Sequence, residues 1–111
     1  MPVRISVKGE VVSAYIEGEL DHHNAASIRQ EIDSAVEMNL PSLLVLDFSA
    51  VSFMDSSGIG LVMGRFRNLQ PTGASLHITG TSPHIYKIMK LSGIEKLAKL
   101  DMGGFKVETN K

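Results

Sequence analysis

The sequence predicts a single α/β domain over residues 1–111, with a mixed, mostly parallel sheet of four to five strands, an N-terminal hairpin and about four helices. Short β-prone runs alternate with segments of helical periodicity, an order that favours right-handed crossovers between parallel strands. The run Leu43–Phe48 is apolar apart from Asp47 and is bounded by turn signals, as expected of a strand buried on both faces. A chain of 111 residues suits one hydrophobic core, and no linker or internal repeat divides it.

The first third of the chain predicts a hairpin followed by a helix. Two β-prone runs meet at Gly9, which supplies the positive φ that a tight turn often needs. The second run ends at Gly18–Asp21, after which either Asp21 or Asn24 can cap a helix. Asn39 and Pro41 end that helix. Its apolar residues recur at helical spacing: Ala25, Ile28, Ile32, Ala35 and Val36.

The remainder predicts alternating strands and helices. After the strand at Leu43–Phe48, a second helix runs until Pro71–Gly73, and a strand follows at Ala74–Thr79. Ser82 then caps a third helix whose first turn contains a proline. We expect a fourth, short helix at Ile94–Leu100 and a last edge strand around Phe105 and Val107. The predicted core stripe of the second helix is Ile59, Val62, Met63, Phe66 and Leu69.

Composition excludes several classes of function. The net charge of −1 gives no general attraction to nucleic acid or to a membrane surface. The absence of cysteine removes disulfides, thiolate metal sites and cysteine nucleophiles. No signal-peptide pattern opens the chain, and no apolar run approaches the roughly 20 residues of a membrane span. We therefore expect a cytoplasmic protein.

The most informative segment is Phe53–Gly60, which follows an apolar strand and opens a helix. Ser56 and Ser57 lie there at a helix start, where unpaired N–H groups and the helix dipole favour a phosphate. The structural alternative is that both serines, or Asp55, merely cap the helix, because all three are preferred N-cap residues.

Together with Gly18–His23, this segment resembles the phospho-acceptor region of anti-sigma factor antagonists, bacterial proteins built from a lone STAS domain. The resemblance covers nearly the whole chain and is strongest to the sporulation-type branch. It implies that Ser56 is phosphorylated by an anti-sigma factor that is also a serine kinase. Binding of that kinase by the unphosphorylated protein frees a sigma factor, and a PP2C-type phosphatase resets the switch. The alternative within the family is an accessory STAS module of a lipid or anion transport assembly.

The resemblance also places the partner surface around Ser56. We expect it to include Asp21, Asp55, Ser57, Gly60, Leu61 and Gly64. Gly60 and Gly64 lie on one helix face, where the absence of side chains lets a partner backbone approach, and Leu61 is expected to offer an apolar anchor. Alternatively, the two glycines pack against another element of the same domain, since glycine within a helix is unfavourable by up to ~1 kcal/mol.

Other chemistries fit poorly, and we expect neither an enzyme nor a cofactor or metal. Neither serine has the Gly-x-Ser-x-Gly context of a hydrolase nucleophile. Gly58, Gly60 and Gly64 miss the dinucleotide spacing, and no P-loop lysine follows them. His22 and His23 lack further ligands at zinc-like spacing. The basic residues of the later helices are expected to be solvated rather than to bind nucleic acid: Arg65, Arg67, Lys87, Lys90, Lys96 and Lys99.

Overall fold

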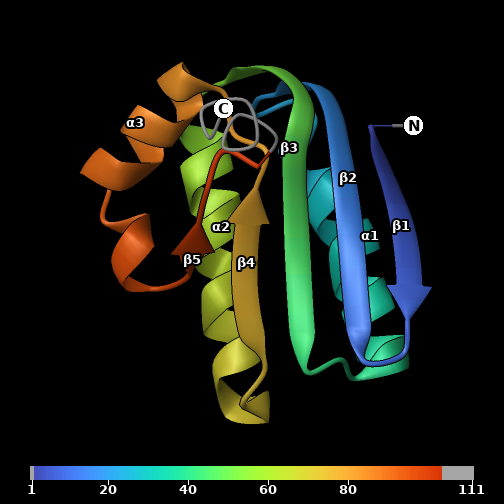
Figure 1. The fold of residues 1–111 in the computed structure, drawn as a ribbon. Coiled ribbons are helices and arrows are strands. Elements are labelled where there is room, and N and C mark those ends of the chain that lie inside the picture. Colours follow the sequence, from blue (N-terminus) through green and yellow to red (C-terminus); the bar gives the residue numbers. More distant parts are fainter. Residues whose placement is uncertain (1, 104–111) are drawn as a thin grey trace.

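The five strands form one sheet in the order β1-β2-β3-β4-β5 in the computed structural model, which describes residues 2–103 (Figure 1). β1 and β2 pair antiparallel, whereas each later neighbour pair is parallel. The predicted mixed, mostly parallel sheet with an N-terminal hairpin is therefore confirmed. The strands are β1 (Val3–Lys8), β2 (Val11–Leu20), β3 (Leu43–Met54), β4 (Ser75–Thr79) and β5 (Lys99–Leu100).

Three α-helices occur in the part of the chain that the structure describes: α1 (Ala25–Asn39), α2 (Ser56–Leu69) and α3 (Pro83–Leu91). The two long helices, α1 and α2, lie on the same face of the sheet, and α3 lies near the β5 edge (Figure 1). Short 3₁₀ turns follow α2 at Gln70–Thr72 and α3 at Ile94–Lys96. None of the helices within residues 2–103 is long and apolar enough to cross a membrane.

The prediction of a fourth helix at Ile94–Leu100 is wrong. Only Ile94–Lys96 forms a helical turn, and Lys99–Leu100 instead pairs with β4 as strand β5. A seven-residue helix gains few backbone hydrogen bonds for the cost of its nucleation, whereas the open edge of β4 offers ready partners. The strand expected around Phe105 and Val107 lies outside the described residues.

Asp101 fixes the segment that follows β5 against β4. Its carboxylate accepts hydrogen bonds from Thr79 Oγ1 at 2.6 Å and from the Gly103 N–H at 2.8 Å. The other carboxylate oxygen lies 2.8 Å from His77 Nε2. Burial raises the pKa of Asp101, but these hydrogen bonds outweigh that effect and hold its pKa at about 2.

Two turns show how local sequence sets the boundaries. Gly9 takes a φ of +59° in the β1–β2 turn, as the sequence predicts. Helix α1 ends as expected between Asn39 and Pro41, but Leu40 supplies the left-handed residue, with a φ of +46°. Its N–H donates to the Val36 carbonyl at 2.8 Å. A non-glycine residue in this conformation is strained, because Cβ approaches the neighbouring carbonyl.

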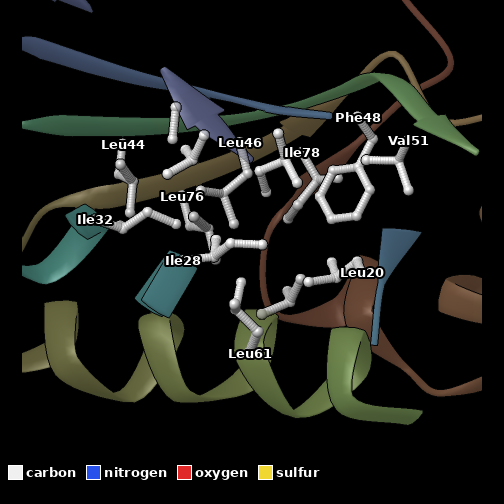
Figure 2. Packing of buried hydrophobic residues seen from close by; sticks show 14 of the residues in the cluster. Leu20, Ile28, Ile32, Leu44, Leu46, Phe48, Val51, Leu61, Leu76 and Ile78 are labelled. Atoms are coloured by element: carbon white, nitrogen blue, oxygen red, sulfur yellow. The ribbon is translucent and has the colours of Figure 1, made fainter. Parts of the chain in front are cut away.

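The core fills the space between the sheet and its two long helices (Figure 2). Alternate residues of the strands point toward the helices, as the period of two in a strand requires. Ile28 and Ile32 of α1 and Leu61 of α2 meet them. The sheet contributes Val12, Ala14 and Ile16 from β2, Leu44, Leu46 and Phe48 from β3, and Leu76 and Ile78 from β4.

The buried stripe of α2 is rotated by about one residue from the predicted one. Of the predicted stripe, only Val62 and Leu69 are buried, and the other three residues are partly buried at its margin. This rotation follows from packing on two sides, because α2 contacts α1 as well as the sheet. The buried residues of α2 are Gly58, Leu61, Val62, Arg65 and Leu69.

Candidate functional site

The two sequence motifs meet where β2 and β3 end. Two irregularities in the β2–β3 register, around Ile16 and between Gly18 and Glu19, bring Leu20 opposite Met54. The Asp55 N–H then donates to the Leu20 carbonyl at 3.2 Å. The loop after β2 and the start of α2 therefore lie side by side at the carboxyl edge of the parallel strands.

Asp55 caps helix α2. Its backbone is extended, and its Oδ1 accepts a hydrogen bond from the Ser57 N–H at 2.8 Å. Its carbonyl accepts from the Gly58 N–H at 3.0 Å. The hydrogen bond from the Ser57 backbone lowers the pKa of Asp55, so the cap is ionised at neutral pH. Of the three residues that the capping alternative names, Asp55 is therefore the N-cap of α2.

Ser56 is the first residue of α2, and its side chain is exposed. Ser57, one residue further on, is half-buried. Because Asp55 serves as the cap, the Ser56 hydroxyl is not needed for that role. A group attached to it would stand in solvent at the positive end of the helix dipole, which favours negative charge.

The loop after β2 is held by Asp21. The Asp21 Oδ1 accepts hydrogen bonds from the N–H groups of His23 and Asn24, at 3.0 and 3.1 Å. Asn24 precedes the first residue of α1, but its side chain instead donates to the Glu19 carbonyl at 2.8 Å. His22 Nδ1 lies 3.9 Å from Asp55 Oδ2. Asp21 therefore shapes a loop that contacts the α2 cap.

The glycines of α2 differ in what surrounds them. A Cβ added to Gly60 or to Gly64 would meet nothing within 4 Å, so the alternative in which these two glycines pack inside the domain is wrong. Gly58 behaves in the opposite way, because a Cβ there would overlap the Met54 side chain and approach Leu20 Cδ2 to 3.2 Å. Gly58 thus seats α2 on the strand ends, whereas Gly60 and Gly64 face open space.

Two predictions about α2 side chains are wrong. Leu61 is only 5% exposed and points into the core, so it offers no apolar anchor to a partner (Figure 2). Arg65 is also 5% exposed rather than solvated. It lies against α1, with its Nε 2.9 Å from Asp33 Oδ1. Both errors follow from the rotated stripe, which turns positions 61 and 65 toward the sheet and α1.

Phe53 is a site residue that the sequence reasoning did not single out. It is 51% exposed at the end of β3, opposite Glu19 of β2. Strand alternation could not have found it, because β3 stops alternating after Phe48 and two exposed residues, Ser52 and Phe53, lie between the buried Val51 and Met54. An exposed aromatic ring three residues before Ser56 is a suitable anchor for a docked protein.

Histidine and carboxylate side chains come together at two places in the described residues. Of the four histidines, His22 lies near Asp55 and His77 pairs with Asp101. Within residues 2–103 no group of three His, Cys, Asp or Glu side chains is placed to hold a metal ion.

Comparison with known proteins finds a matching domain family and related proteins. Residues 3–103 match the family model of the STAS domain. The anti-sigma F factor antagonist of Lysinibacillus sphaericus is 36% identical over 79% of this chain and 75% of that protein. Its counterpart from Paenibacillus polymyxa is 30% identical over 78% of this chain and 74% of that protein.

The anti-sigma factor antagonist SpoIIAA has been solved in two forms. Its unphosphorylated form superposes with a TM-score of 0.73, at 30% identity, over 96% of this chain and 93% of that one. Its phosphorylated form, from Bacillus, gives a TM-score of 0.72 at 30% identity, over 98% of this chain and 99% of that one. The chain therefore belongs to the STAS domain family, and it groups there with the anti-sigma factor antagonists of the sporulation type.

Proposed function

We propose that this protein is an anti-anti-sigma factor that is switched by phosphorylation of Ser56. In the unphosphorylated state it binds an anti-sigma factor that is also a serine kinase, and so releases a sigma factor. Phosphate transferred from ATP to Ser56 ends the binding, and a PP2C-type phosphatase restores the first state. The protein itself has no catalytic role in this cycle.

One observation carries the proposal: Ser56 is exposed at the first position of α2, directly after an aspartate that already caps the helix. Phosphorylation there adds negative charge beside the Asp55 carboxylate. Asp55 already accepts hydrogen bonds from the first turn of α2, so the phosphate is not needed to order that turn. A docked partner, by contrast, has to desolvate that charge and face two anions instead of one.

The partner surface follows from the need to bring ATP to Ser56. It comprises Asp21, Asp55 and Ser57 around the acceptor serine and the open glycines Gly60 and Gly64 along α2. We add Phe53 in place of Leu61 as the apolar anchor, because Phe53 is exposed and Leu61 is not.

The first test is phosphorylation itself. The purified protein is incubated with ATP and the anti-sigma kinase encoded in the same genome, and peptides are examined by mass spectrometry. We expect one phosphate, on Ser56. The Ser56→Ala variant serves as the control and should accept none. Phosphate on Ser57 in the parent protein would contradict the assignment.

The second test separates the charge switch from a change of fold. Ser56→Asp places a carboxylate at the helix start, where it is tolerated or stabilising by ~0.3–1 kcal/mol. We expect this variant to keep its circular dichroism spectrum and to lose affinity for the kinase, while Ser56→Ala binds and cannot be switched off. A Ser56→Asp variant that binds as tightly as the parent would refute the charge mechanism.

A further inference from the structure

A groove between α1 and α2 begins beside the acceptor serine and is rich in arginine. It encloses about 300 Å³ and is lined by Ser57, Gly60, Gly64 and Arg67 of α2 and by Arg29 of α1, with Arg65 in its wall. Gly60, Gly64 and Arg67 recur at helical spacing and so share one face of α2. The groove exists because the two glycines leave open space there.

Positive charge in this groove is poorly compensated. Within residues 2–103, Asp33 is the one carboxylate paired with any of the three arginines, through the 2.9 Å approach of its Oδ1 to Arg65 Nε. That pair is not aligned for a hydrogen bond, and the buried Arg65 Nη1 also lacks a hydrogen-bond partner in the described chain. Arg29 and Arg67 are exposed. Three guanidinium groups thus face one carboxylate.

The surroundings of Arg65 also disfavour its charged form. Burial lowers the pKa of Arg65, Asp33 opposes the shift, and the positive charges of Arg29 and Arg67 add to it. The two exposed arginines are therefore close enough to act on the buried one. A further anion in the groove would relieve this repulsion.

We propose that the groove receives an acidic side chain of the anti-sigma partner, held between Arg29 and Arg67. This inference rests on the proposed function, because a kinase that reaches Ser56 must cover the adjoining groove. Guanidinium groups bind carboxylates through short, charge-assisted hydrogen bonds, often two at a time. The bare glycine face leaves room for the incoming side chain to pass along α2. The groove thereby adds an attractive contact to a surface whose other charges, Asp21 and Asp55, are negative.

Charge reversal tests the inference. Arg29→Glu and Arg67→Glu are titrated with the anti-sigma kinase by calorimetry, in the unphosphorylated state and at low and high salt. Lys8→Glu is the matched control, since it makes the same charge change on an exposed residue at the hairpin turn, at the opposite end of the sheet from Ser56. We expect both groove variants to lose roughly tenfold or more in affinity and the control to bind like the parent. High salt should weaken binding of the parent more than that of the groove variants.

The possible results separate this inference from the function on which it rests. If the parent protein binds no anti-sigma kinase, the proposed function fails and the inference falls with it. If the parent binds and is switched by Ser56 phosphorylation, while both groove variants bind equally well, the inference alone is overturned. It is also overturned if inorganic phosphate binds the groove of the parent and the variants lose only that binding.

Discussion

Replacing Gly60 by glutamine should make the domain more stable and abolish binding of its partner. The residue lies in the first half of α2, exposed, on the face proposed to meet the anti-sigma kinase. Point substitutions on average destabilise a protein by about 1 kcal/mol. For Gly60→Gln, stability should rise while affinity for the partner falls.

The expected gain in stability follows from the surroundings of Gly60. Since a Cβ there meets nothing within 4 Å, the new side chain causes no clash. The helix gains the difference in propensity between glycine and glutamine, about 0.5–1 kcal/mol. For a domain of this size, that corresponds to a rise in Tm of about 2–4 °C. The same side chain projects several ångströms from α2 and would hold a docked protein away from it.

Gly58→Ala provides the contrasting variant two residues earlier in the same helix. Its Cβ would overlap the Met54 side chain and press on Leu20. Overpacking of this kind is unfavourable by about 1–3 kcal/mol, which exceeds the gain in helix propensity at a first-turn position. We therefore expect this variant to unfold at a lower temperature than the parent.

The assays are thermal and urea unfolding followed by circular dichroism, and a binding titration with the anti-sigma kinase. Ser34→Gln, on the exposed surface of α1, controls for the addition of a glutamine. A Gly60→Gln variant that is less stable than the parent would show that the glycine packs inside the domain. A stable variant with unchanged affinity would move the docking surface elsewhere.

Three further predictions use other features of the structure. Leu40→Gly should stabilise the domain by about 0.5–1 kcal/mol in urea unfolding. Glycine removes the strain of a left-handed residue (~1–2 kcal/mol), which exceeds the entropy that glycine adds to the unfolded chain (~0.4–1 kcal/mol). An unchanged urea midpoint would show that Leu40 is not strained. Asp101 has a native pKa of about 2 against an ordinary 3.8, so its contribution of about 2 kcal/mol is present above pH 3.8 and is lost as the pH falls toward 2. Unfolding measured across that range should show a larger loss of stability in the parent than in Asp101→Asn, which keeps the other carboxylates such as Asp55. Phe53→Ala should weaken kinase binding roughly tenfold in calorimetry, since exposed aromatic anchors dominate interfaces, and should leave the urea midpoint nearly unchanged; equal affinity would remove Phe53 from the surface.

Local patterns in the sequence were enough to predict the three α-helices and most of strands β1 to β4, although β3 continues past the predicted end at Phe48 to Met54. The turn at Gly9, the stop between Asn39 and Pro41, and the Ser82 cap are signals that act within a few residues, and all three appear in the structure. Strand β5 escaped prediction because its two residues show no periodicity, and the edge of β4 decides their conformation.

The errors at the site have a different origin. The burial of Leu61 and Arg65 depends on α1 lying beside α2, with Asp33 as the counter-ion of the arginine. That arrangement is tertiary, and the helical periodicity of α2 alone cannot orient the helix to within one residue. The arginine groove was not predicted for the same reason, since Arg29 and Arg67 come from different helices.

The cap formed by Asp55 has a consequence for how quickly the proposed phosphorylation of Ser56 can be reversed. Since the first turn of α2 is hydrogen-bonded in the absence of a phosphate, neither the proposed phosphorylation of Ser56 nor its reversal requires the chain to refold. In a switch of this kind, the domain returns to the same conformation as soon as the phosphate is removed. In the proposed cycle, the response time would then be set by the kinase, the phosphatase and the dissociation of the partner.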